Sequence, residues 1–406
     1  MNRIPPWFAA LALALLASPA GAAVFVVDTN ADGADTDPGD TFCDADALLG
    51  GNQCTLRAAV MESNALDGAD TIQLPTGTFA LTIPDFLAPD NATTGDLDVQ
   101  EGGLTIEGAA ATGAVASVIE AKKAKHRAFD SFGELTLRDL AVINGKVSPK
   151  TDPIGIGQGS GGCIRARVAL TLERVVLSDC SADPDGGALA QIGGALTIMD
   201  STISENSAKQ DGGGVKLNPT FTSIERSLIA SNKAGDEGGG LAITSGFVDV
   251  FNSTFSGNSA KTEGGAILNE VDGDLALVHV TLTGNKAKQG AVIHVNDTLN
   301  PPTTTVANSI FDSRKGNNCH QSLATMIVSL GGNLDSGSSC GFAAAQDFSD
   351  LDPLLEPLTD NGGPTLTHAL DSNSPAVDRT SANCESEDQR GTARAAPCDA
   401  GAFELP

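Results

Sequence analysis

A pair of glycines recurs along the middle of this 406-residue chain at nearly constant intervals. Successive pairs begin 25 to 27 residues apart, and such a fixed period indicates one structural unit repeated many times. The pairs begin at Gly161, Gly186, Gly213, Gly239 and Gly264, and Gly290 continues the series. Between them, apolar and polar residues alternate with the period of a strand, without the spacing of a helix face. The chain is therefore expected to stack short strands from coil to coil.

Aligning the repeats produces columns of similar residues. Two apolar columns contain Leu172, Ile198, Ile224, Val250 and Leu277, and then Leu177, Ile203, Ile229, Phe255 and Leu282. An amide column follows, made of Asn206, Asn232, Asn258 and Asn285. Asparagines stacked at one turn can chain their amides and bond the backbone there. A polar column, expected to face outward, contains Arg174, Asp200, Arg226, Asn252 and His279.

These columns predict an all-β fold, a single-stranded right-handed parallel β-helix of the pectate-lyase type, with its coils between residues 97 and 345. A single coil leaves its core and strand edges open, so the first coil needs a cap. An amphipathic pattern over residues 56–66, with Thr55 as N-cap, predicts a short capping helix. Residues 24–96 are therefore assigned to an N-terminal cap.

The N-terminus has the pattern of an export signal. Arg3 supplies the positive charge, residues 7–17 are apolar, and residues 20–22 form a small-residue cleavage site. The apolar run is too short to span a bilayer, and no later segment reaches that length. Residues 1–23 are therefore predicted to be a signal peptide, and the mature chain an extracellular, cell-surface or periplasmic monomer.

Eight cysteines in an exported chain favour structural disulfides over metal binding or redox chemistry. Their order favours pairing between neighbours, although other connectivities stay open. The expected pairs are Cys43 with Cys54, Cys163 with Cys180, Cys319 with Cys340, and Cys384 with Cys398.

The formal net charge of -27 argues against nucleic acid or an anionic membrane as a partner. An anionic glycan would also be repelled unless calcium bridged it, whereas cationic partners remain open. The chain has no Tyr, and its single Trp lies in the predicted signal. Because sugars often stack on such rings, this composition disfavours a dedicated carbohydrate-binding module.

Three stretches resemble known families. The segments DPGDTFC (37–43) and CTLRAAVMESNALDGADTIQLPTGTF (54–79) resemble the CSLREA domain of secreted bacterial β-helix proteins. Residues 352–404 are similar to the choice-of-anchor Q domain of bacterial surface proteins, so residues 346–406 are assigned to a C-terminal region. FSGN (255–258) and GGAI (264–267) resemble the repeats of polymorphic outer membrane proteins. These resemblances imply export and surface display, and they imply no reaction.

One acidic loop resembles the first half of a calcium loop. Asp28, Asn30 and Asp32 occupy alternating ligand positions and Gly33 the sharp turn, but the twelfth position is Gly39, which offers no carboxylate. A Ca²⁺ site is one interpretation. A solvated acidic loop, tied by the neighbouring disulfide, is the other.

The weak candidates for catalysis are the acids that precede the glycine pairs, namely Asp185, Asp211, Glu237 and Glu263. Glycan lyases and hydrolases built on β-helices place such carboxylates on one exposed face. Lysines at 209, 233, 261 and 286 lie close to them in sequence, which favours surface ion pairs instead.

Two functions follow from these patterns. The favoured one is a non-catalytic exported rod, an adhesin or envelope or matrix protein that contacts a cell-surface glycan or protein. The alternative is a calcium-assisted polysaccharide lyase or glycoside hydrolase, which requires acids and a basic residue to converge in a groove on the coil face.

Overall fold

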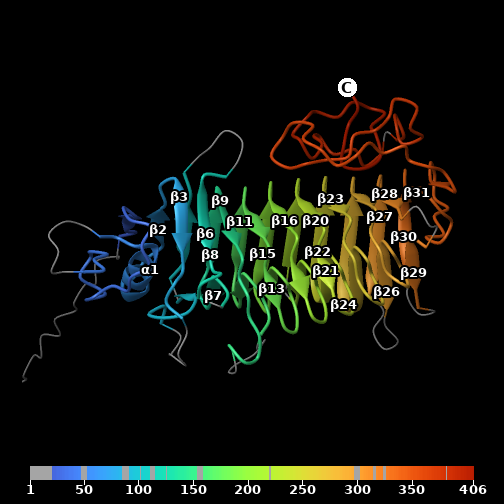
Figure 1. The fold of residues 1–406 in the computed structure, drawn as a ribbon. Coiled ribbons are helices and arrows are strands. Elements are labelled where there is room, and N and C mark those ends of the chain that lie inside the picture. The colour runs from blue at the N-terminus through green and yellow to red at the C-terminus, as the bar shows by residue number, and fades with distance from the viewer. Residues whose placement is uncertain are drawn as a thin grey trace, which may run out of the picture.

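The chain winds into a right-handed parallel β-helix in a computed structural model, which confirms the predicted fold class. The coils stack along one axis, and the C-terminal region lies along one side of the rod (Figure 1). The structure describes residues 21–46, 53–84, 91–100, 102–109, 115–124, 126–152, 159–218, 221–296, 302–313, 317–322, 326–380 and 382–406.

The first sheet has 18 strands in two parallel ladders that merge in the long strands β22 and β24. Its strands are β1 (Val24–Val26), β2 (Asp70–Gln73), β4 (Leu97–Val99), β5 (Leu104–Glu107), β7 (Phe129–Ser131), β8 (Leu135–Arg138), β10 (Ile164–Ala166), β11 (Leu170–Glu173), β14 (Leu189–Gln191), β15 (Ala195–Met199), β18 (Val215–Leu217), β19 (Phe221–Glu225), β22 (Leu241–Phe251), β24 (Ile267–Val278), β26 (Ile293–Asn296), β27 (Thr303–Ala307), β29 (Cys319–Gln321) and β30 (Met326–Gly331). The longer ladder, from β1 to β30, makes the rod about 50 Å long at the usual strand spacing.

Two further sheets complete each coil. The second sheet has 11 strands, β3 (Gly77–Ala80), β6 (Ser117–Glu120), β9 (Leu140–Ile143), β12 (Val176–Ser178), β16 (Thr202–Ser204), β20 (Leu228–Ala230), β23 (Thr254–Ser256), β25 (Thr281–Thr283), β28 (Ile310–Asp312), β31 (Leu334–Asp335) and β32 (Phe348–Ser349). The third sheet contains β13 (Ser181–Ala182), β17 (Ser207–Ala208) and β21 (Lys233–Ala234). All strand pairs within the three sheets for which a register is defined are parallel, from Val24↔Thr71 at one end to Leu334↔Phe348 at the other.

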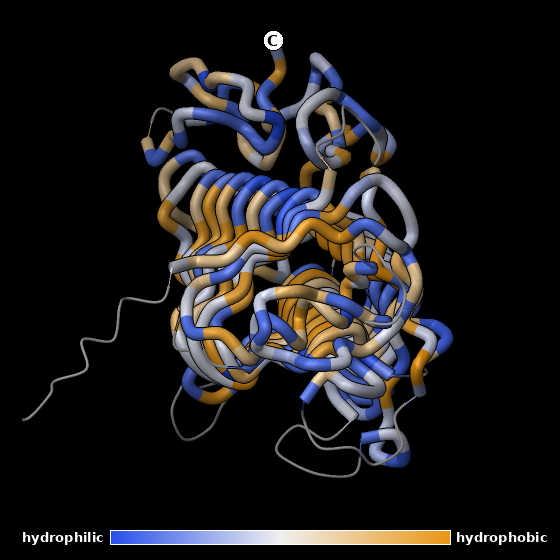
Figure 2. Tube along the Cα trace, turned by 90° about the vertical axis from the view of Figure 1, so that its left-hand side faces the viewer, coloured by the Kyte–Doolittle hydropathy of each residue, from blue (hydrophilic) through white to orange (hydrophobic). Residues whose placement is uncertain are grey.

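The apolar columns predicted from the repeats form the interior of the rod. Leu172 pairs with Ile198, and Ile198 with Ile224, while Ile203 pairs with Ile229. All five are fully buried. Viewed from the end, residues of similar hydropathy form continuous stripes along the stacked coils (Figure 2). Because like residues lie above like, each coil buries its apolar face against its neighbours.

The asparagine column forms a hydrogen-bonded ladder at one corner. Asn206 Nδ2 donates to Asn232 Oδ1 at 3.0 Å, and Asn232 Nδ2 donates to Asn258 Oδ1 at 3.0 Å. The same Nδ2 of Asn232 also donates to the carbonyl of Ile203 at 2.9 Å. Asn285 continues the series beneath Asn258. The ladder therefore bonds backbone groups that the tight corner would leave unpaired.

One α-helix, α1 (Leu56–Ala65), packs against β2 and β4 near the N-terminal end. Thr55 is its N-cap, because its side chain accepts a hydrogen bond from the backbone N–H of Ala58 at 2.9 Å. Parallel pairing already begins at β1, so the coils start before the predicted boundary at residue 97. The expected signal peptide lies outside the described residues except for 21–23.

The C-terminal region covers part of the second sheet. The backbone N–H of Ala402 donates to Thr281 Oγ1 at 2.9 Å, and Thr254 Oγ1 donates to Gln389 Oε1 at 2.6 Å. His279, expected to face solvent, is fully buried beneath this region, and its imidazole bonds the carbonyl of Asn383 at 3.2 Å. That expectation was wrong because the column of His279 is solvent-facing only where no other segment covers it.

The eight cysteines pair in chain order, as predicted. The disulfides join Cys43 to Cys54, Cys163 to Cys180, Cys319 to Cys340, and Cys384 to Cys398. The first tethers the loop before α1, the second and third lie within coils, and the fourth lies in the C-terminal region. No helix in the described residues has the length and apolar character needed to cross a membrane.

Candidate functional site

The four acids singled out from the sequence form a column at the corner that leads into the first sheet. The backbone carbonyls of Asp211, Glu237 and Glu263 accept hydrogen bonds from glycine N–H groups one coil away, at 2.9 to 3.0 Å. Asp185 starts the column, and its Oδ1 accepts from the backbone N–H of Asp211 at 3.1 Å. We call these four residues the acid band. Each acid lies about 4.8 Å along the axis from the next.

The carboxyl groups of the acid band oppose one another's ionisation. Partial burial, and then the nearby charges of Glu263, Glu270 and Asp211, raise the pKa of Glu237 to about 7. Burial also raises the pKa of Asp185, Glu263 and Glu270. A carboxyl group with a pKa near neutrality can accept and release protons, which is the property of a general acid or base.

The lysines expected to neutralise these acids mostly do not. Lys216 Nζ lies 3.2 Å from Asp211 Oδ2, and Lys209 pairs with Asp183 outside the band. In the described part of the chain, no ion pair joins Lys233, Lys261 or Lys286 to the acid band. The expectation of coil-to-coil ion pairs is therefore wrong for most of these lysines.

Two histidines border the acid band at its C-terminal end. His294 Nε2 lies 3.1 Å from Glu263 Oε2, and the rings of His294 and His320 stack with centroids 4.8 Å apart. Burial, and then the neighbouring His320, lower the pKa of His294 to about 4. His294 is thus neutral at physiological pH, and its contact with Glu263 is not an ion pair there. The sequence reasoning missed this contact, although His294 follows the Gly290 corner by four residues.

The raised pKa of Glu237 makes stability depend on pH. Its folded pKa of about 7 exceeds the ordinary value of 4.5, so the folded protein holds more protons between these values and loses stability as pH rises through them. Glu237→Gln removes the ionisation, and we expect its Tm to exceed that of the wild type by roughly 1 to 3 °C at pH 8, with the gain largely lost at pH 5. Glu205→Gln, at an exposed carboxylate, is the control. An equal gain for Glu237→Gln at both pH values would contradict the expectation.

The predicted calcium loop does not assemble as a metal site. Arg57 Nε donates to Asp32 Oδ1 at 2.6 Å, and the backbone N–H of Ile83 donates to Asp32 Oδ2 at 2.8 Å. Asp28 and Asn30 are exposed, whereas the side chain of Asp32 is buried. Both carboxylate oxygens of Asp32 are thus bonded to protein groups, which argues against the interpretation as a Ca²⁺ site and favours the acidic loop.

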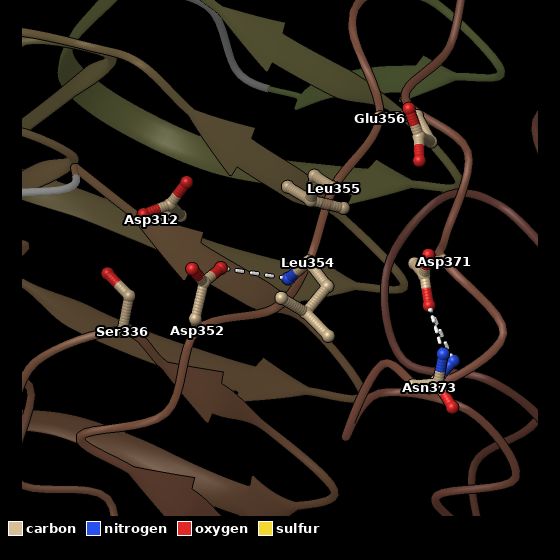
Figure 3. A pocket seen from close by; sticks show the side chains of 8 residues that line it. All are labelled: Asp312, Ser336, Asp352, Leu354, Leu355, Glu356, Asp371 and Asn373. Carbon is tan, nitrogen blue, oxygen red and sulfur yellow. Dashed lines mark hydrogen bonds between the residues drawn. The ribbon is translucent and has the colours of Figure 1, made fainter.

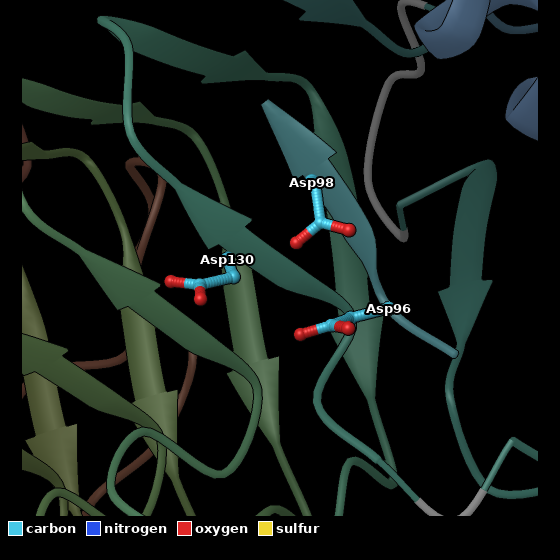
Figure 4. Close-up of side chains that lie close together, drawn as sticks. All are labelled: Asp96, Asp98 and Asp130. Carbon is cyan, nitrogen blue, oxygen red and sulfur yellow. The ribbon is translucent and has the colours of Figure 1, made fainter. Parts of the chain in front are cut away.

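Three buried carboxylates do converge elsewhere. Oxygen atoms of Asp96, Asp98 and Asp130 lie within 4.8 Å of one another near strands β4 and β7 (Figure 4). Arginines balance their charge, since Arg165 Nε donates to Asp130 Oδ1 at 2.9 Å and Arg127 Nη1 donates to Asp96 Oδ2 at 3.1 Å. We interpret this group as a buried ion-pair network, because guanidinium groups bond Asp96 and Asp130, and the backbone N–H of Ala92 donates to Asp98 Oδ2 at 2.9 Å.

Asp152 ties the network together. Its Oδ2 accepts hydrogen bonds from Arg127 and Arg165, both at 2.6 Å. Burial alone would raise the pKa of Asp152, but the charges of these two arginines lower it. For Asp96, burial is likewise outweighed by His126 and Arg127, which together lower its pKa. The carboxyl groups of Asp96 and Asp152 therefore stay ionised at neutral pH.

A cavity of about 780 Å³ lies between the last coils and the C-terminal region. Asp312, Ser336 and Asp352 lie on one side of it, and Glu356, Asp371 and Asn373 lie on the other (Figure 3). Leu354 and Leu355 complete the lining. No Arg, Lys or His is among the described residues that line it, so the combination of carboxylates with a basic residue that the lyase alternative requires is not found there.

Comparisons with known proteins found one short family match and a few similar structures. Residues 252–270 match the repeat of the Chlamydia polymorphic membrane proteins, which agrees with the resemblance of FSGN and GGAI. No curated protein matches the chain significantly. The pectate lyase Pel9A is similar in structure with a TM-score of 0.48 and 15% identity, over 95% of this chain and 96% of that chain.

Two structures of the PL6 family alginate lyase AlyGC are also similar, each at 10% identity. Their TM-scores are 0.36 and 0.33, over 79% and 83% of this chain. The chain spans only 55% and 58% of the length of those chains.

Proposed function

We propose that the protein is an exported, non-catalytic rod that binds an extended partner at a cell surface or in an extracellular matrix. The observation that carries this proposal is the repetition of the same outward side chain on successive coils. A single column of the first sheet contains Thr71, Thr105, Thr136, Thr171, Thr197 and Ser223. In the described part of the chain, none of these half-buried hydroxyl groups has a hydrogen-bond partner. A surface that repeats along a rod suits a partner that extends along it.

Charged groups beside this column are paired with one another. Arg138 Nε donates to Glu173 Oε2 at 2.7 Å, and Arg174 Nε donates to Asp139 Oδ1 at 2.6 Å. Their function is therefore to stabilise neighbouring coils, and they are not free for proton transfer to a substrate. The four disulfides, together with the predicted signal and the two terminal resemblances, support an oxidising, extracellular location.

The test is to incubate the mature protein with cell-envelope fractions and matrix polysaccharides and to measure both retention and product release. We expect saturable retention on at least one fraction, without unsaturated or reducing-end products, with and without calcium. Retention on none of the fractions would refute the proposed binding function.

A glycan lyase or hydrolase is the second candidate, and the raised pKa of Glu237 beside Glu263 and Glu270 is the observation that favours it. If the protein is such an enzyme, the wild type should release unsaturated or reducing-end products, and Glu237→Gln should abolish their release. Such products, together with their loss in the variant, would replace the binding proposal by an enzymatic one.

A further inference from the structure

Lysines gather on one face of this acidic protein. Strand pairing in and beside the third sheet places Ser207, Lys233, Ser259 and Lys286 in one column, one coil apart. Lys209, Lys261 and Lys288 each follow this column by two residues, on the same short segments. We call Lys209, Lys233, Lys261, Lys286 and Lys288 the lysine stripe. It supplies at least one ammonium group on each of four successive coils.

The lysine stripe differs from the arginines in its exposure. All five lysines are exposed, and the side chain of Lys209 is 71% exposed even though it pairs with Asp183. In the described part of the chain, no ion pair involves the other four lysines. By contrast, Arg127 and Arg165 are buried in the ion-pair network. Lysine thus supplies the cations that face solvent, whereas these arginines hold coils together.

Hydroxyl groups lie between the ammonium groups. Ser207 and Ser259 occupy the same column as Lys233 and Lys286, and both are half-buried. A hydroxyl can donate and accept hydrogen bonds, while an ammonium group only donates. The stripe therefore offers alternating charge and hydrogen-bonding capacity along the rod axis, which matches a polymer that carries both anionic groups and hydroxyls.

Although the net charge of the whole chain repels an anionic glycan, we propose that the lysine stripe binds a single chain of an acidic polysaccharide without bridging calcium. The chain would lie parallel to the rod axis with its carboxylate or sulfate groups against the lysines. This inference rests on the proposed binding function and names the class of its partner. One coil advances about 4.8 Å along the axis. Because a sugar ring has a similar length, a chain with one anionic group per sugar residue can meet a lysine at each coil.

The neighbouring acids favour a partner that is only one polymer chain wide. Asp211 and Glu263 follow Lys209 and Lys261 by two residues, so the acid band runs beside the stripe. A membrane or a DNA duplex would bring its phosphates over both bands and be repelled by the acids, whereas one glycan chain can lie on the lysines alone. The large exposed apolar side chains of the described chain all lie elsewhere, so this face offers nothing to insert into a bilayer.

The test uses the full mature chain and the triple variant Lys233→Gln/Lys261→Gln/Lys286→Gln. Its matched control is Lys122→Gln/Lys123→Gln/Lys150→Gln, which removes the same charge at three exposed lysines outside the stripe. The probes are polygalacturonate, chondroitin sulfate and neutral dextran. We expect an acidic probe to bind the wild type and the control within twofold of each other, and the stripe variant at least tenfold more weakly. Rising salt should weaken wild-type binding more steeply than binding of the stripe variant.

Several outcomes would overturn the proposal. These are binding of neutral dextran as tightly as of the acidic probes, equal binding by the stripe variant and the control, or no binding of either acidic probe. Tighter binding to phosphatidylglycerol vesicles or duplex DNA would instead identify a different class of partner. If envelope fractions still retain the stripe variant at the wild-type level, the proposed binding function stands and only the lysine stripe fails.

Discussion

Replacing Arg165 by Met is expected to lower the free energy of unfolding by about 3 to 5 kcal/mol, because two buried carboxylates lose one of their two arginine partners and the network loses a positive charge. The Arg165 guanidinium lies 2.9 Å from Asp130 and 2.6 Å from Asp152, and all three side chains are buried. Burial alone would lower the pKa of Arg165, but Asp130 and Asp152 raise it, so the arginine is always charged. Urea denaturation followed by circular dichroism measures the loss.

Arg138→Met is the matched control, since Arg138 also bridges two acids across coils but its side chain is 35% exposed. Arg138→Met should lower the free energy of unfolding by less than about 1 kcal/mol. If Arg165→Met does not fold well enough to measure, Arg165→Lys keeps the charge and should lie between the two. If the Arg165 and Arg138 variants unfolded at the same urea concentration, the buried network would contribute no more to stability than a surface ion pair does.

The pH dependence of this variant has a definite sign. In the wild type the pKa of Asp152 is lowered, so its stabilising contribution is present above the ordinary value of 3.8 and is lost only below it. Without Arg165, Arg127 still lowers the pKa of Asp152, but one of the two arginine charges that do so is lost. The pKa of Asp152 should therefore be higher in the variant than in the wild type, so protonation relieves the variant at a higher pH. We therefore expect the difference between variant and wild type to shrink as pH falls from 8 to 4. A difference that grows over this range would contradict the network.

The coil interior was predictable because each sequence repeat forms one coil. The spacing of the repeats therefore determines which residues of adjacent coils pair. Leu172, Ile198 and Ile224 fall in one column when the glycine pairs are aligned, and they pair in the same register in the structure. The ladder amides Asn232 and Asn258 follow from the same alignment. A local pattern sufficed here because each contact joins adjacent repeats.

Contacts outside the regular repeats were not predictable in this way. Asp130 and Arg165 pair across 35 residues, and Asp130 lies in a coil that precedes the first glycine pair, so no alignment placed them together. His279 is covered by a segment that contacts it across 104 residues. Periodicity describes how a coil stacks on the next, and it carries no information on where a non-repeating segment folds back.

The acid and lysine columns show a second limit of sequence spacing. Lys261 and Glu263 are two residues apart, which suggested an ion pair, yet no such pair forms in the part of the chain that the structure describes. The charges that raise the pKa of Glu237 after burial are other acids, including Glu263 and Glu270. At a tight corner the chain changes direction, so side chains two residues apart can belong to adjacent columns without forming an ion pair. Spacing in a straight strand does not carry over to such a corner.

Asn232→Ala is the second substitution with a large expected effect, a loss of about 2 to 4 kcal/mol in the free energy of unfolding. Asn232 Oδ1 accepts from the backbone N–H and the Nδ2 of Asn206, and its Nδ2 donates to Ile203 and Asn258. Alanine removes all four bonds and leaves their buried partners with one bond fewer. Amide hydrogen exchange should report the change locally, with faster exchange at Asn206.

Asn30→Ala is the matched control, because it deletes the same side-chain atoms at a position that is exposed to solvent. Its effect should stay within about 0.5 kcal/mol. Since Asn206, Asn232 and Asn258 form one chain of amides, deleting the middle member interrupts the ladder on both sides, and Asn232→Ala should cost more than deleting the terminal member by Asn285→Ala. If the two ladder variants lost no more stability than Asn30→Ala, the apolar core alone would stabilise the stacking of the coils. The amides would then only fix the geometry of the corner.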